Sequence, residues 1–390
     1  MTGARLVHVT TTDMSLDWLL RPQLEAFGRA GYDVIGVSAP GPHVASLEAA
    51  GIRHVAVPSL TRAMSPAQDL RALNDLRRVF RRLSPDIVHT HNPKPGVLGR
   101  VAARAAGVPH VVNTVHGLYA LPEDRFAKRA LVYGLERLAT TCSDAELLQN
   151  EEDVDALRHA GVPHRKMTVL GNGVDLARFD PAAVDPGTRD RLRSAWGIGP
   201  DTTVIGVVGR LVWEKGYRTV FAAAERLRDR DCRFVVVGPD EPDKVGAVDA
   251  EARAAAEAAG VVFLGRRDDM VDLYAAFDVF ALASHREGFP RSAMEASAMG
   301  LPVVASDVRG CRQVVAHGRT GALFAVGDVD AFARALVPLI ENDDRRRRTG
   351  AAARERACRY FDERDVIATT LRTYDWLLAR QRAGVAVASA

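Results

Sequence analysis

A chain of 390 residues is longer than one ordinary hydrophobic core requires, so its length favours two domains. The apolar fraction of 47% and the charged fraction of 26% are typical of a soluble globular protein. A formal net charge of +3 is close to neutral for this length and argues against a dedicated nucleic-acid-binding protein.

The cysteines and the apolar runs bear on cellular location. Cys142, Cys232, Cys311 and Cys358 are widely spaced and form no C-x-x-C pair, which is typical of reduced thiols and not of a disulfide framework or a zinc site. The N-terminus MTGARLVHVTTT leads directly into a predicted strand, without a charged and then apolar leader. No apolar stretch has the length of a membrane span. We therefore expect a cytoplasmic protein that at most touches the inner face of the plasma membrane.

Short β-branched runs alternate with helical patterns through the first half of the chain, which is typical of parallel α/β units. The predicted strands are residues 5–10, 32–38, 53–58, 86–91, 110–116 and 145–149. Helical patterns cover residues 15–30, 66–83 and 95–106. The stretch FDPAAVDPGTRD at 179–190 is rich in Pro and Asp and interrupts the alternation, so it predicts a linker.

The second half of the chain repeats the alternation, with predicted strands at 202–209, 233–238, 261–265, 278–284 and 302–307. The expected fold class is α/β, with two Rossmann-like, doubly wound domains that face a central cleft. We place an N-terminal domain at 1–180, a linker at 181–195, a C-terminal domain at 196–361, and a last helix at 362–382 that we expect to pack back on the first domain.

One helical pattern in the first half is strongly basic. Residues 69–85, DLRALNDLRRVFRRLSP, place arginines beside an apolar stripe that includes Leu73, Leu76 and Phe80. A basic amphipathic helix could dock on anionic lipid, as a lipid-linked acceptor would require. Alternatively, the apolar stripe packs on a sheet and the arginines face water. In a chain this rich in arginine we favour the packed arrangement.

The stretch VVGRLVWEKG at 207–216 places two cations where a strand ends and the next helix begins. Arg210 follows the strand and Lys215 precedes the helix, beside unpaired helix N–H groups. A guanidinium fork and an ammonium point charge both suit phosphate oxygens, so this turn is a candidate diphosphate site. A solvated basic turn explains the residues equally well. The absence of G-x-x-x-x-G-K-[ST] excludes a P-loop ATPase.

The stretch REGFPRSAME at 286–295 places Glu287 just before a predicted helix and Glu295 inside it. Pro290 suits a first helical position, and the backbone N–H groups of Gly288 and Phe289 would point into the cleft. Glu295 would lie ~7 Å further along the helix, at ~1.5 Å per residue. A carboxylate can accept hydrogen bonds from both hydroxyls of a vicinal diol such as that of a ribose. The alternative, a capping acid and a helix-surface charge, is what the local pattern alone favours.

Two further turns contain candidate residues. NTVHGLY at 113–119 places His116 at a strand end, where it could touch a sugar hydroxyl or direct its carbonyl at a reacting carbon. A structural histidine is the alternative for this position. VLGNGVDLARFDP at 169–181 contains a Gly-Asn-Gly turn with Asn172 at its centre, a pattern typical of a hinge.

Together these motifs resemble the retaining glycosyltransferases of family 4, whose two-Rossmann-domain architecture is called GT-B. The resemblance extends over essentially the whole chain and rests on GRLVWEKG, NGVDLARFDP, FLGRRDDMVDLYAAFDVFALAS, EGFPRSAMEASAMGLPVVAS and HGRTGALF, in that order. The first half is most similar to the branch that builds bacterial polysaccharides and lipid-linked glycans. The resemblance implies transfer of a hexose or N-acetylhexosamine from a UDP-sugar, or next a GDP-sugar, to a glycan, lipid-linked or small hydroxyl acceptor.

The resemblance also implies roles for the candidate residues. Arg210 and Lys215 match the pair that neutralises the donor diphosphate, which a metal ion does in other transferases, so we expect neither a metal nor a cofactor. Glu287 and Glu295 match the E-x7-E pattern, whose first acid contacts the donor sugar and whose second holds the ribose. The other matches are Gly288, Phe289 and Pro290 near the donor, His116 facing the transferred sugar, and Gly265 and Arg266 flanking the nucleobase. We take Glu287, His116, Arg210 and Lys215 as the catalytic candidates.

The acceptor side is where the chain departs from the family pattern. Many relatives carry a glycine pair after the first strand, but this loop reads TTTDMSLDW at 10–18. Thr12 and Asp13 are its acceptor-side candidates, and Asn172 is a third. Retention of configuration is implied by the family. We favour front-face attack, in which the leaving phosphate takes the acceptor's proton, over a covalent role for Glu287, because no paired base is evident.

Other functional classes make distinct demands on the sequence. A GT-B nucleotide-sugar 2-epimerase would release an altered donor without any acceptor, and it lacks the EKG and EGFP context found here. A two-lobed periplasmic sugar-binding protein would need an export signal. A dehydrogenase would carry G-x-G-x-x-G after the first strand. We therefore expect a sugar transferase without a nucleic-acid partner.

Overall fold

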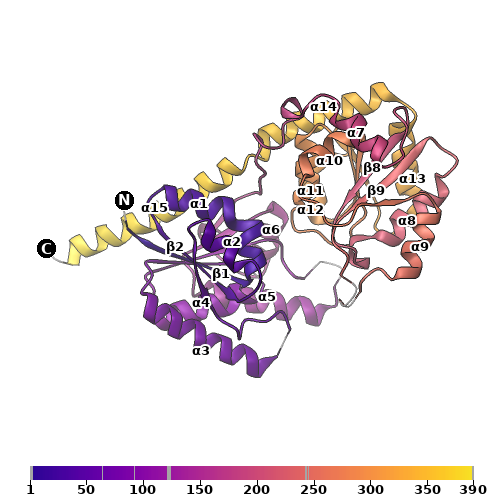
Figure 1. Ribbon diagram of the computed structural model, residues 1–390. Helices are drawn as coiled ribbons and strands as arrows, with labels where there is room; N and C mark the ends of the chain where they lie inside the picture. Colours follow the sequence, from indigo (N-terminus) through magenta and orange to yellow (C-terminus); the bar gives the residue numbers. More distant parts are fainter. Residues whose placement is uncertain are drawn as a thin grey trace. The chain divides into compact units, whose positions relative to one another are not determined.

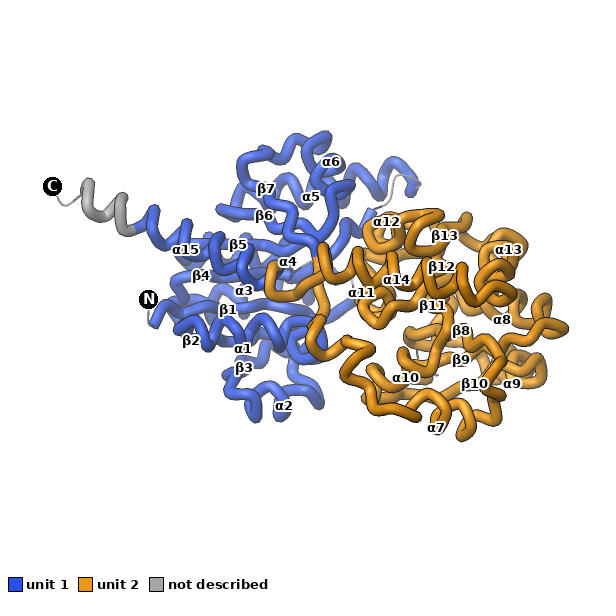
Figure 2. Tube along the Cα trace, turned by 90° about the horizontal axis from the view of Figure 1, so that it is seen from above, with its two compact units in different colours: residues 1–171, 366–390 blue, residues 172–365 orange. Residues whose placement is uncertain are grey.

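The computed structural model describes residues 3–63, 65–91, 93–120, 124–241, 244 and 246–388, with side chains described as far as residue 381. The chain forms two compact units (Figure 2). Unit 1 comprises Met1–Gly171 and Val366–Ala390, and unit 2 comprises Asn172–Asp365. The division precedes the stretch 181–195 that we assigned to a linker, and this stretch contains η3 and α7 of unit 2.

Unit 1 is built on a seven-stranded parallel sheet with the strand order β3-β2-β1-β4-β5-β6-β7, whose strands are labelled in Figure 2. Its strands are β1 (Arg5–Thr12), β2 (Asp33–Ala39), β3 (Arg53–Ala56), β4 (Ile87–His91), β5 (His110–Val115), β6 (Ala145–Leu148) and β7 (Met167–Val169). The first six agree with the predicted strands to within two residues at each end. The sequence analysis did not assign β7.

Helices connect the successive strands of unit 1. They are the π-helix η1 (Ser15–Leu20), α1 (Arg21–Arg29), α2 (Val44–Ala49), α3 (Pro66–Leu83), α4 (Lys94–Ala106), α5 (Phe126–Thr140), α6 (Glu151–His159) and the 3-10 helix η2 (His164–Lys166). The helix predicted at 15–30 is therefore divided into η1 and α1, and those at 66–83 and 95–106 match α3 and α4.

The two faces of the first sheet have separate cores, because successive residues of a strand point to opposite faces. Leu6 of β1 packs with Phe27 of α1 on one face. Val7 and Val9 pack with Phe80 of α3 on the other. The strand order reverses between β1 and β4, and in open α/β sheets such a switch point is where ligands bind.

Unit 2 contains a six-stranded parallel sheet with the order β10-β9-β8-β11-β12-β13, which reverses between β8 and β11. Its strands are β8 (Thr203–Val208), β9 (Cys232–Val237), β10 (Val262–Phe263), β11 (Val279–Leu282), β12 (Val303–Ser306) and β13 (Gly321–Phe324). The first five match the predicted strands, whereas β13, within HGRTGALF, was not assigned from the sequence. Two cores, one on each face of the sheet, again follow the alternation of strand residues.

The helices of unit 2 cover both faces of this sheet (Figure 1). They are η3 (Pro181–Ala183), α7 (Thr188–Ala195), η4 (Trp213–Lys215), α8 (Tyr217–Arg226), α9 (Ala250–Ala258), α10 (Met270–Ala276), α11 (Arg291–Ala298), α12 (Arg309–Val314), α13 (Val329–Ile340) and α14 (Asp343–Tyr360). The last helix, α15 (Glu363–Ala388), begins in unit 2 and continues in unit 1, where Tyr374 and Leu377 are buried in the core beside α1.

The basic helix predicted at 69–85 is α3, and its apolar stripe packs on the sheet. Ala72, Leu76 and Phe80 are buried, whereas Leu70 is 63% exposed. The packed arrangement is therefore the one found. Within the described residues, no helix combines the length and the apolarity that crossing a membrane requires.

Helix α5 has exposed apolar side chains on one side and buried polar side chains on the other. Leu131 and Leu138 are 61% and 63% exposed, and Phe126, at the start of the helix, is 82% exposed. Glu136 and Thr140, on the side opposite Leu131 and Leu138, are buried. An exposed apolar stripe of this kind is typical of a surface that meets a partner or a membrane.

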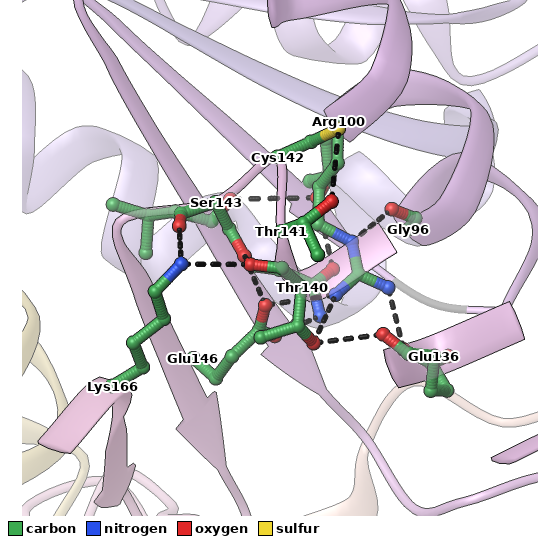
Figure 3. Close-up of polar contacts among 12 residues, drawn as sticks. Gly96, Arg100, Glu136, Thr140, Thr141, Cys142, Ser143, Glu146 and Lys166 are labelled. Atoms are coloured by element: carbon green, nitrogen blue, oxygen red, sulfur yellow. Dashed lines mark hydrogen bonds and ion pairs between the residues drawn. The ribbon is translucent and has the colours of Figure 1, made fainter. Parts of the chain in front are cut away.

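The buried face of α5 joins an ion network in unit 1 (Figure 3). Arg100 of α4 is fully buried and binds Glu136 of α5 and Glu146 of β6, with 2.8 Å between Arg100 Nη1 and Glu146 Oε1. Asn113 of β5 donates to the second oxygen of Glu146 at 2.8 Å. Burial raises the pKa of Glu136, and Arg100 offsets part of this shift. One guanidinium therefore connects α4, α5 and β6.

Candidate active site

The cationic turn predicted at 207–216 lies at the switch point of the second sheet. Arg210 follows β8, and Lys215 ends η4 just before α8. Glu287 follows β11, the strand beside β8 on the other side of the switch. The structure thus brings Lys215 and Glu287 together, although they are far apart in the sequence.

Lys215 and Glu287 form a largely buried ion pair, with 2.7 Å between Lys215 Nζ and Glu287 Oε1. Ser284 donates its hydroxyl to the same oxygen at 2.6 Å. Gly216 permits this approach: its φ is +77°, and a Cβ there would lie 1.9 Å from the carbonyl oxygen of Ala283. A larger residue at position 216 would therefore push Lys215 away from the end of β11.

The backbone that follows Glu287 is held from two sides. The N–H group of Gly310, in α12, donates to the Glu287 carbonyl oxygen at 3.2 Å. A Cβ at Gly310 would lie 2.6 Å from the carbonyl oxygen of Gly288, so glycine is needed for this contact as well. Asn172 Nδ2 donates to the Phe289 carbonyl oxygen at 3.3 Å. Asn172, which we grouped with the acceptor side, thus lies in unit 2 against the predicted donor loop.

Arg210 also has an acidic partner. Its Nη1 lies 3.1 Å from Glu241 Oε2, and Lys244 Nζ lies 2.9 Å from the same oxygen. Burial by itself would raise the pKa of Glu241, but the hydrogen bonds from Lys244 and Arg210 outweigh it and lower the pKa. Both predicted phosphate-binding cations therefore bond a carboxylate, an anion with the same kind of oxygens as a diphosphate.

Glu295 lies within α11, whose preceding residue Pro290 is the helix N-cap and not its first residue. Tyr274 of α10 donates its hydroxyl to Glu295 Oε2 at 2.9 Å, and Arg291 Nε donates to Oε1 at 3.1 Å. Burial raises the pKa of Glu295, and Arg291 and Tyr274 offset part of this shift. Because both oxygens have a partner, a ribose diol would have to share them or displace one donor.

The predicted nucleobase-flanking pair follows β10. Gly265 has a φ of +65°, and its carbonyl oxygen accepts a hydrogen bond from the N–H of Gly238, which follows β9, at 2.9 Å. The Arg266 side chain is more than half exposed, and its Nη2 lies 3.7 Å from Asp268 Oδ1. A hollow of about 480 Å³ between the β9 end and α9, lined by Lys244 and Arg253 among others, includes none of the predicted donor residues.

The acceptor-side candidates Thr12 and Asp13 lie at the end of β1, at the switch point of the first sheet. Thr12 Oγ1 lies 3.2 Å from Ser15 Oγ. Asp13 is buried, and its two carboxylate oxygens accept hydrogen bonds from the backbone N–H groups of Met14, at 2.9 Å, and His43, at 2.7 Å. This carboxylate therefore organises the loop after β1, and its role toward an acceptor remains a prediction.

His116 follows β5 and is hydrogen-bonded to a second histidine, with 2.9 Å between His116 Nε2 and His91 Nδ1. His91 Nε2 lies 3.0 Å from His8 Nδ1. Burial lowers the pKa of His116 to about 4 and that of His8 to about 3, so both rings are neutral at neutral pH. The ligand atoms of His8, His89 and His91 lie within 4.8 Å of one another, the one such group of potential metal ligands within the described residues.

Sequence reasoning missed several partners of the predicted residues: Ser284, Glu241, Tyr274, Arg291, His8 and His91. The histidines left a signal in the sequence, because His89 and His91 are two residues apart in one predicted strand and therefore share a face. The other partners come from separate strand ends and helices, and no local pattern joins them to their sites.

Comparison with known proteins finds relatives along most of the chain. The family model "Glycosyltransferase Family 4" matches residues 23–178, and "Glycosyl transferases group 1" matches residues 188–356. The UDP-Gal:alpha-D-GlcNAc-diphosphoundecaprenol alpha-1,3-galactosyltransferase of Escherichia coli is 34% identical, over 75% of this chain and 76% of that protein. The N,N'-diacetylbacillosaminyl-diphospho-undecaprenol alpha-1,3-N-acetylgalactosaminyltransferase of Campylobacter jejuni is 26% identical, over 80% of this chain and 83% of that protein.

Solved structures resemble the chain over nearly its full length. Anabaena Alr3699/HepE in complex with UDP and glucose has a TM-score of 0.79 at 20% identity, covering 95% of this chain and 99% of that chain. A glycosyltransferase from Rickettsia africae has a TM-score of 0.80 at 18% identity, covering 97% of this chain and 99% of that chain. At these identities the likeness is one of fold.

Proposed function

The chain belongs to glycosyltransferase family 4 and has the GT-B fold, and from this premise we propose that it is a retaining, metal-independent transferase of a hexose or N-acetylhexosamine from a UDP-sugar. The observation that carries the proposal is the buried Lys215–Glu287 pair at the switch point of the second sheet, with Arg210 at the end of the neighbouring strand β8. These positions support a donor diphosphate bound across the ends of β8 and β11.

In the proposed reaction, the bond between the anomeric carbon of the sugar and the diphosphate oxygen breaks, and its electron pair stays with the diphosphate. Arg210 and Lys215 stabilise the negative charge that develops there. The acceptor hydroxyl attacks from the same face, and its proton passes to the leaving phosphate oxygen. No protein base is then required, and Glu287 serves to hold the donor sugar and to orient Lys215.

The acceptor is proposed to be a glycan, a lipid-linked glycan or a small hydroxyl compound, with the lipid-linked class favoured. The Escherichia coli and Campylobacter jejuni relatives are named for diphosphoundecaprenol substrates. The exposed leucines of α5, Leu131 and Leu138, support peripheral contact with a membrane that holds such a lipid. Helix α3, the alternative membrane contact that the sequence offered, has fewer apolar side chains to contribute because its apolar stripe is packed.

Donor binding is tested by a thermal-shift panel of UDP, GDP, ADP and dTDP, each with and without its common sugars and repeated in EDTA. We expect UDP and one UDP-sugar to stabilise the protein, because a ligand at ~100 times its dissociation constant adds ~2.7 kcal/mol to the folded state. Glu295→Gln should weaken UDP binding about tenfold, because a charged hydrogen bond to the ribose is lost. Glu225→Gln, an exposed acid on α8, is the matched control and should change nothing.

Three results would contradict this assignment: no shift with any nucleotide, a shift that EDTA abolishes, or equal binding by the Glu295→Gln and Glu225→Gln variants. A 2-epimerase, the alternative enzyme, is not favoured by the relatives. It would convert the bound UDP-sugar to its epimer without an acceptor, which product analysis of the same samples would detect.

Membrane contact through α5 predicts loss of vesicle binding in Leu131→Ser/Leu138→Ser. Removing two exposed leucines costs roughly 1–2 kcal/mol each at a lipid surface, so cosedimentation with anionic phospholipid vesicles should fall at least about tenfold. Leu70→Ser on α3 is the matched control, because Leu70 and Leu138 are each 63% exposed. If the α5 variant binds vesicles as the wild type does, the assignment of this surface is wrong.

A further inference from the structure

The buried histidines of unit 1 are joined into one continuous chain of hydrogen bonds. His8 of β1 lies beside His89 of β4 in the strand register, and His91 lies beside Thr114 of β5. All of these side chains point to the face of the sheet that α1 and α15 cover, because they occupy alternate positions of their strands. Tyr374 of α15 reaches this face and is fully buried there.

The contacts between neighbours can be followed from one end to the other. Thr114 Oγ1 lies 2.7 Å from His89 Nε2, and His89 Nδ1 is hydrogen-bonded to the Tyr374 hydroxyl. The same hydroxyl lies 3.3 Å from His8 Nε2. His8 Nδ1 then lies 3.0 Å from His91 Nε2, and His91 Nδ1 lies 2.9 Å from Nε2 of His116 at the end of β5.

Each ring in this chain uses both nitrogens, which makes the tautomers depend on one another. A neutral imidazole has one N–H donor and one acceptor nitrogen, so a ring that accepts at Nε2 must donate from Nδ1. Burial lowers the pKa of His89 and His91 well below the ordinary value, as it does for His8 and His116. Burial also raises the pKa of Tyr374 well above its usual range, so its hydroxyl keeps its proton. A phenol hydroxyl donates one hydrogen bond and can accept two, so the chain runs forward, runs in reverse, or has His89 and His8 both donating to Tyr374.

The buried hydroxyls of Thr114 and Tyr374 select the forward direction. Among the hydrogen bonds of the described residues, the Thr114 hydroxyl contacts only His89, and the Tyr374 hydroxyl contacts only His89 and His8. The reversed chain would leave the Thr114 proton without an acceptor, and a Tyr374 that accepts twice would leave its own proton without one, which is costly for a buried hydroxyl. Gln149, which is hydrogen-bonded to His116, is then the acceptor at the far end. Every link runs from Thr114 through His89, Tyr374, His8, His91 and His116 to Gln149.

We propose that Tyr374, His8 and His91 are positioning residues that hold His116 as a single neutral tautomer, Nδ1–H, and so fix the end of β5. The consequence for catalysis rests on the proposed function and on the role that the family resemblance implies for His116, which is to face the transferred sugar. This chain of hydrogen bonds, the histidine relay, also argues against a metal site at His8, His89 and His91. All six ring nitrogens of His8, His89 and His91 are engaged with Thr114, Tyr374, one another or His116. The His89 and His91 rings are moreover stacked, with 4.6 Å between their centroids.

The test is ring ¹⁵N spectroscopy of the full-length protein labelled at histidine, with each signal assigned by single substitution. We expect neutral Nδ1–H tautomers for His8, His89, His91 and His116 at neutral pH. Tyr374→Phe removes the hydroxyl between His89 and His8, so His116 should become a mixture of tautomers. Gln149→Leu removes the terminal acceptor, so the His116 Nδ1–H signal should shift, and this variant leaves α15 unchanged. Tyr32→Phe is the matched control. The ring centroids of Tyr32 and Tyr374 are 5.7 Å apart, but the Tyr32 hydroxyl donates to Asp375 and to none of the histidines.

The functional readout is kept separate from the spectra. The substrate is the nucleotide-sugar that binds in the donor panel. Tyr374→Phe should lower kcat about tenfold and leave the donor KM unchanged, because a misplaced His116 affects the orientation of the donor sugar and not its binding. An Nε2–H or mixed His116 in the wild type, a His116 spectrum unaffected by either variant, or ring shifts that EDTA changes would each overturn the proposal. A chain without transferase activity would fail the proposed function and leave the tautomer result intact.

Discussion

Lys215→Ala is expected to lower the rate of sugar transfer by about 10²- to 10³-fold, the loss typical of removing one group that stabilises developing negative charge. The effect is large because Lys215 is mostly buried and already paired at 2.7 Å with Glu287, so water cannot easily replace its ammonium group. The variant also leaves the Glu287 carboxylate without its cation, next to the proposed position of the diphosphate. Release of nucleoside diphosphate from the donor at saturating concentration measures the rate.

Lys244→Ala is the matched control for this prediction. Lys244 also pairs with a carboxylate, Glu241, at a strand end of the same sheet, but it is not a predicted catalytic residue. The double variant Lys215→Ala/Glu287→Gln also removes the negative charge that Lys215→Ala leaves on Glu287. It should recover part of the donor affinity but not the rate, because the Lys215 ammonium is still missing. Wild-type turnover in Lys215→Ala, or equal losses in Lys215→Ala and Lys244→Ala, would contradict the assignment.

Arg100→Met is expected to destabilise unit 1 by about 3–5 kcal/mol, because it leaves two buried carboxylates without their cation. Arg100 is 0% exposed, and its partners Glu136 and Glu146 are 5% and 0% exposed. No solvent is available to compensate either charge. Urea denaturation followed by a probe of unit 1 measures the loss, since the two units need not unfold in one transition.

Arg104→Met is the control one turn further along α4. Arg104 pairs with Asp144 through side chains that are 32% and 30% exposed, so its loss should cost about 1 kcal/mol. The triple variant Arg100→Met/Glu136→Gln/Glu146→Gln should recover much of the lost stability, because it removes the uncompensated charges. Equal destabilisation by Arg100→Met and Arg104→Met would show that the network is not the reason for the effect.

The pH dependence of Arg100→Met follows from the pKa of Glu136. That pKa is already raised by burial, and loss of Arg100 removes the largest opposing interaction. A group whose pKa is higher in the folded state adds stability at low pH and loses it as the pH rises through the folded pKa. The deficit of the variant relative to the wild type should therefore shrink as the pH falls from about 7.5 toward the ordinary pKa of Glu, about 4.3.

The sequence by itself determined the elements and the family. Runs such as RLVHVT and TTVIGVVG are short, β-branched and bounded by turns, so strands were readable where β1 and β8 lie. The order of GRLVWEKG and EGFPRSAMEASAMGLPVVAS was specific enough to indicate family 4, which the relatives confirm. β7 and β13 were not assigned from the sequence.

Only the tertiary structure decided which side chains meet. The pairing of Lys215 with Glu287 depends on β8 and β11 being neighbours in the sheet, which no local pattern encodes. The same holds for Arg100, whose partners lie on α5 and β6, and for Tyr374, which reaches the histidines from the other end of the chain. Local periodicity sets the face on which a side chain lies, whereas strand order and helix docking set its partner. Leu131 and Leu138 of α5 are the clearest case. Their apolar side chains alone predict burial, but they are exposed because the opposite face of the helix joins the buried ion network.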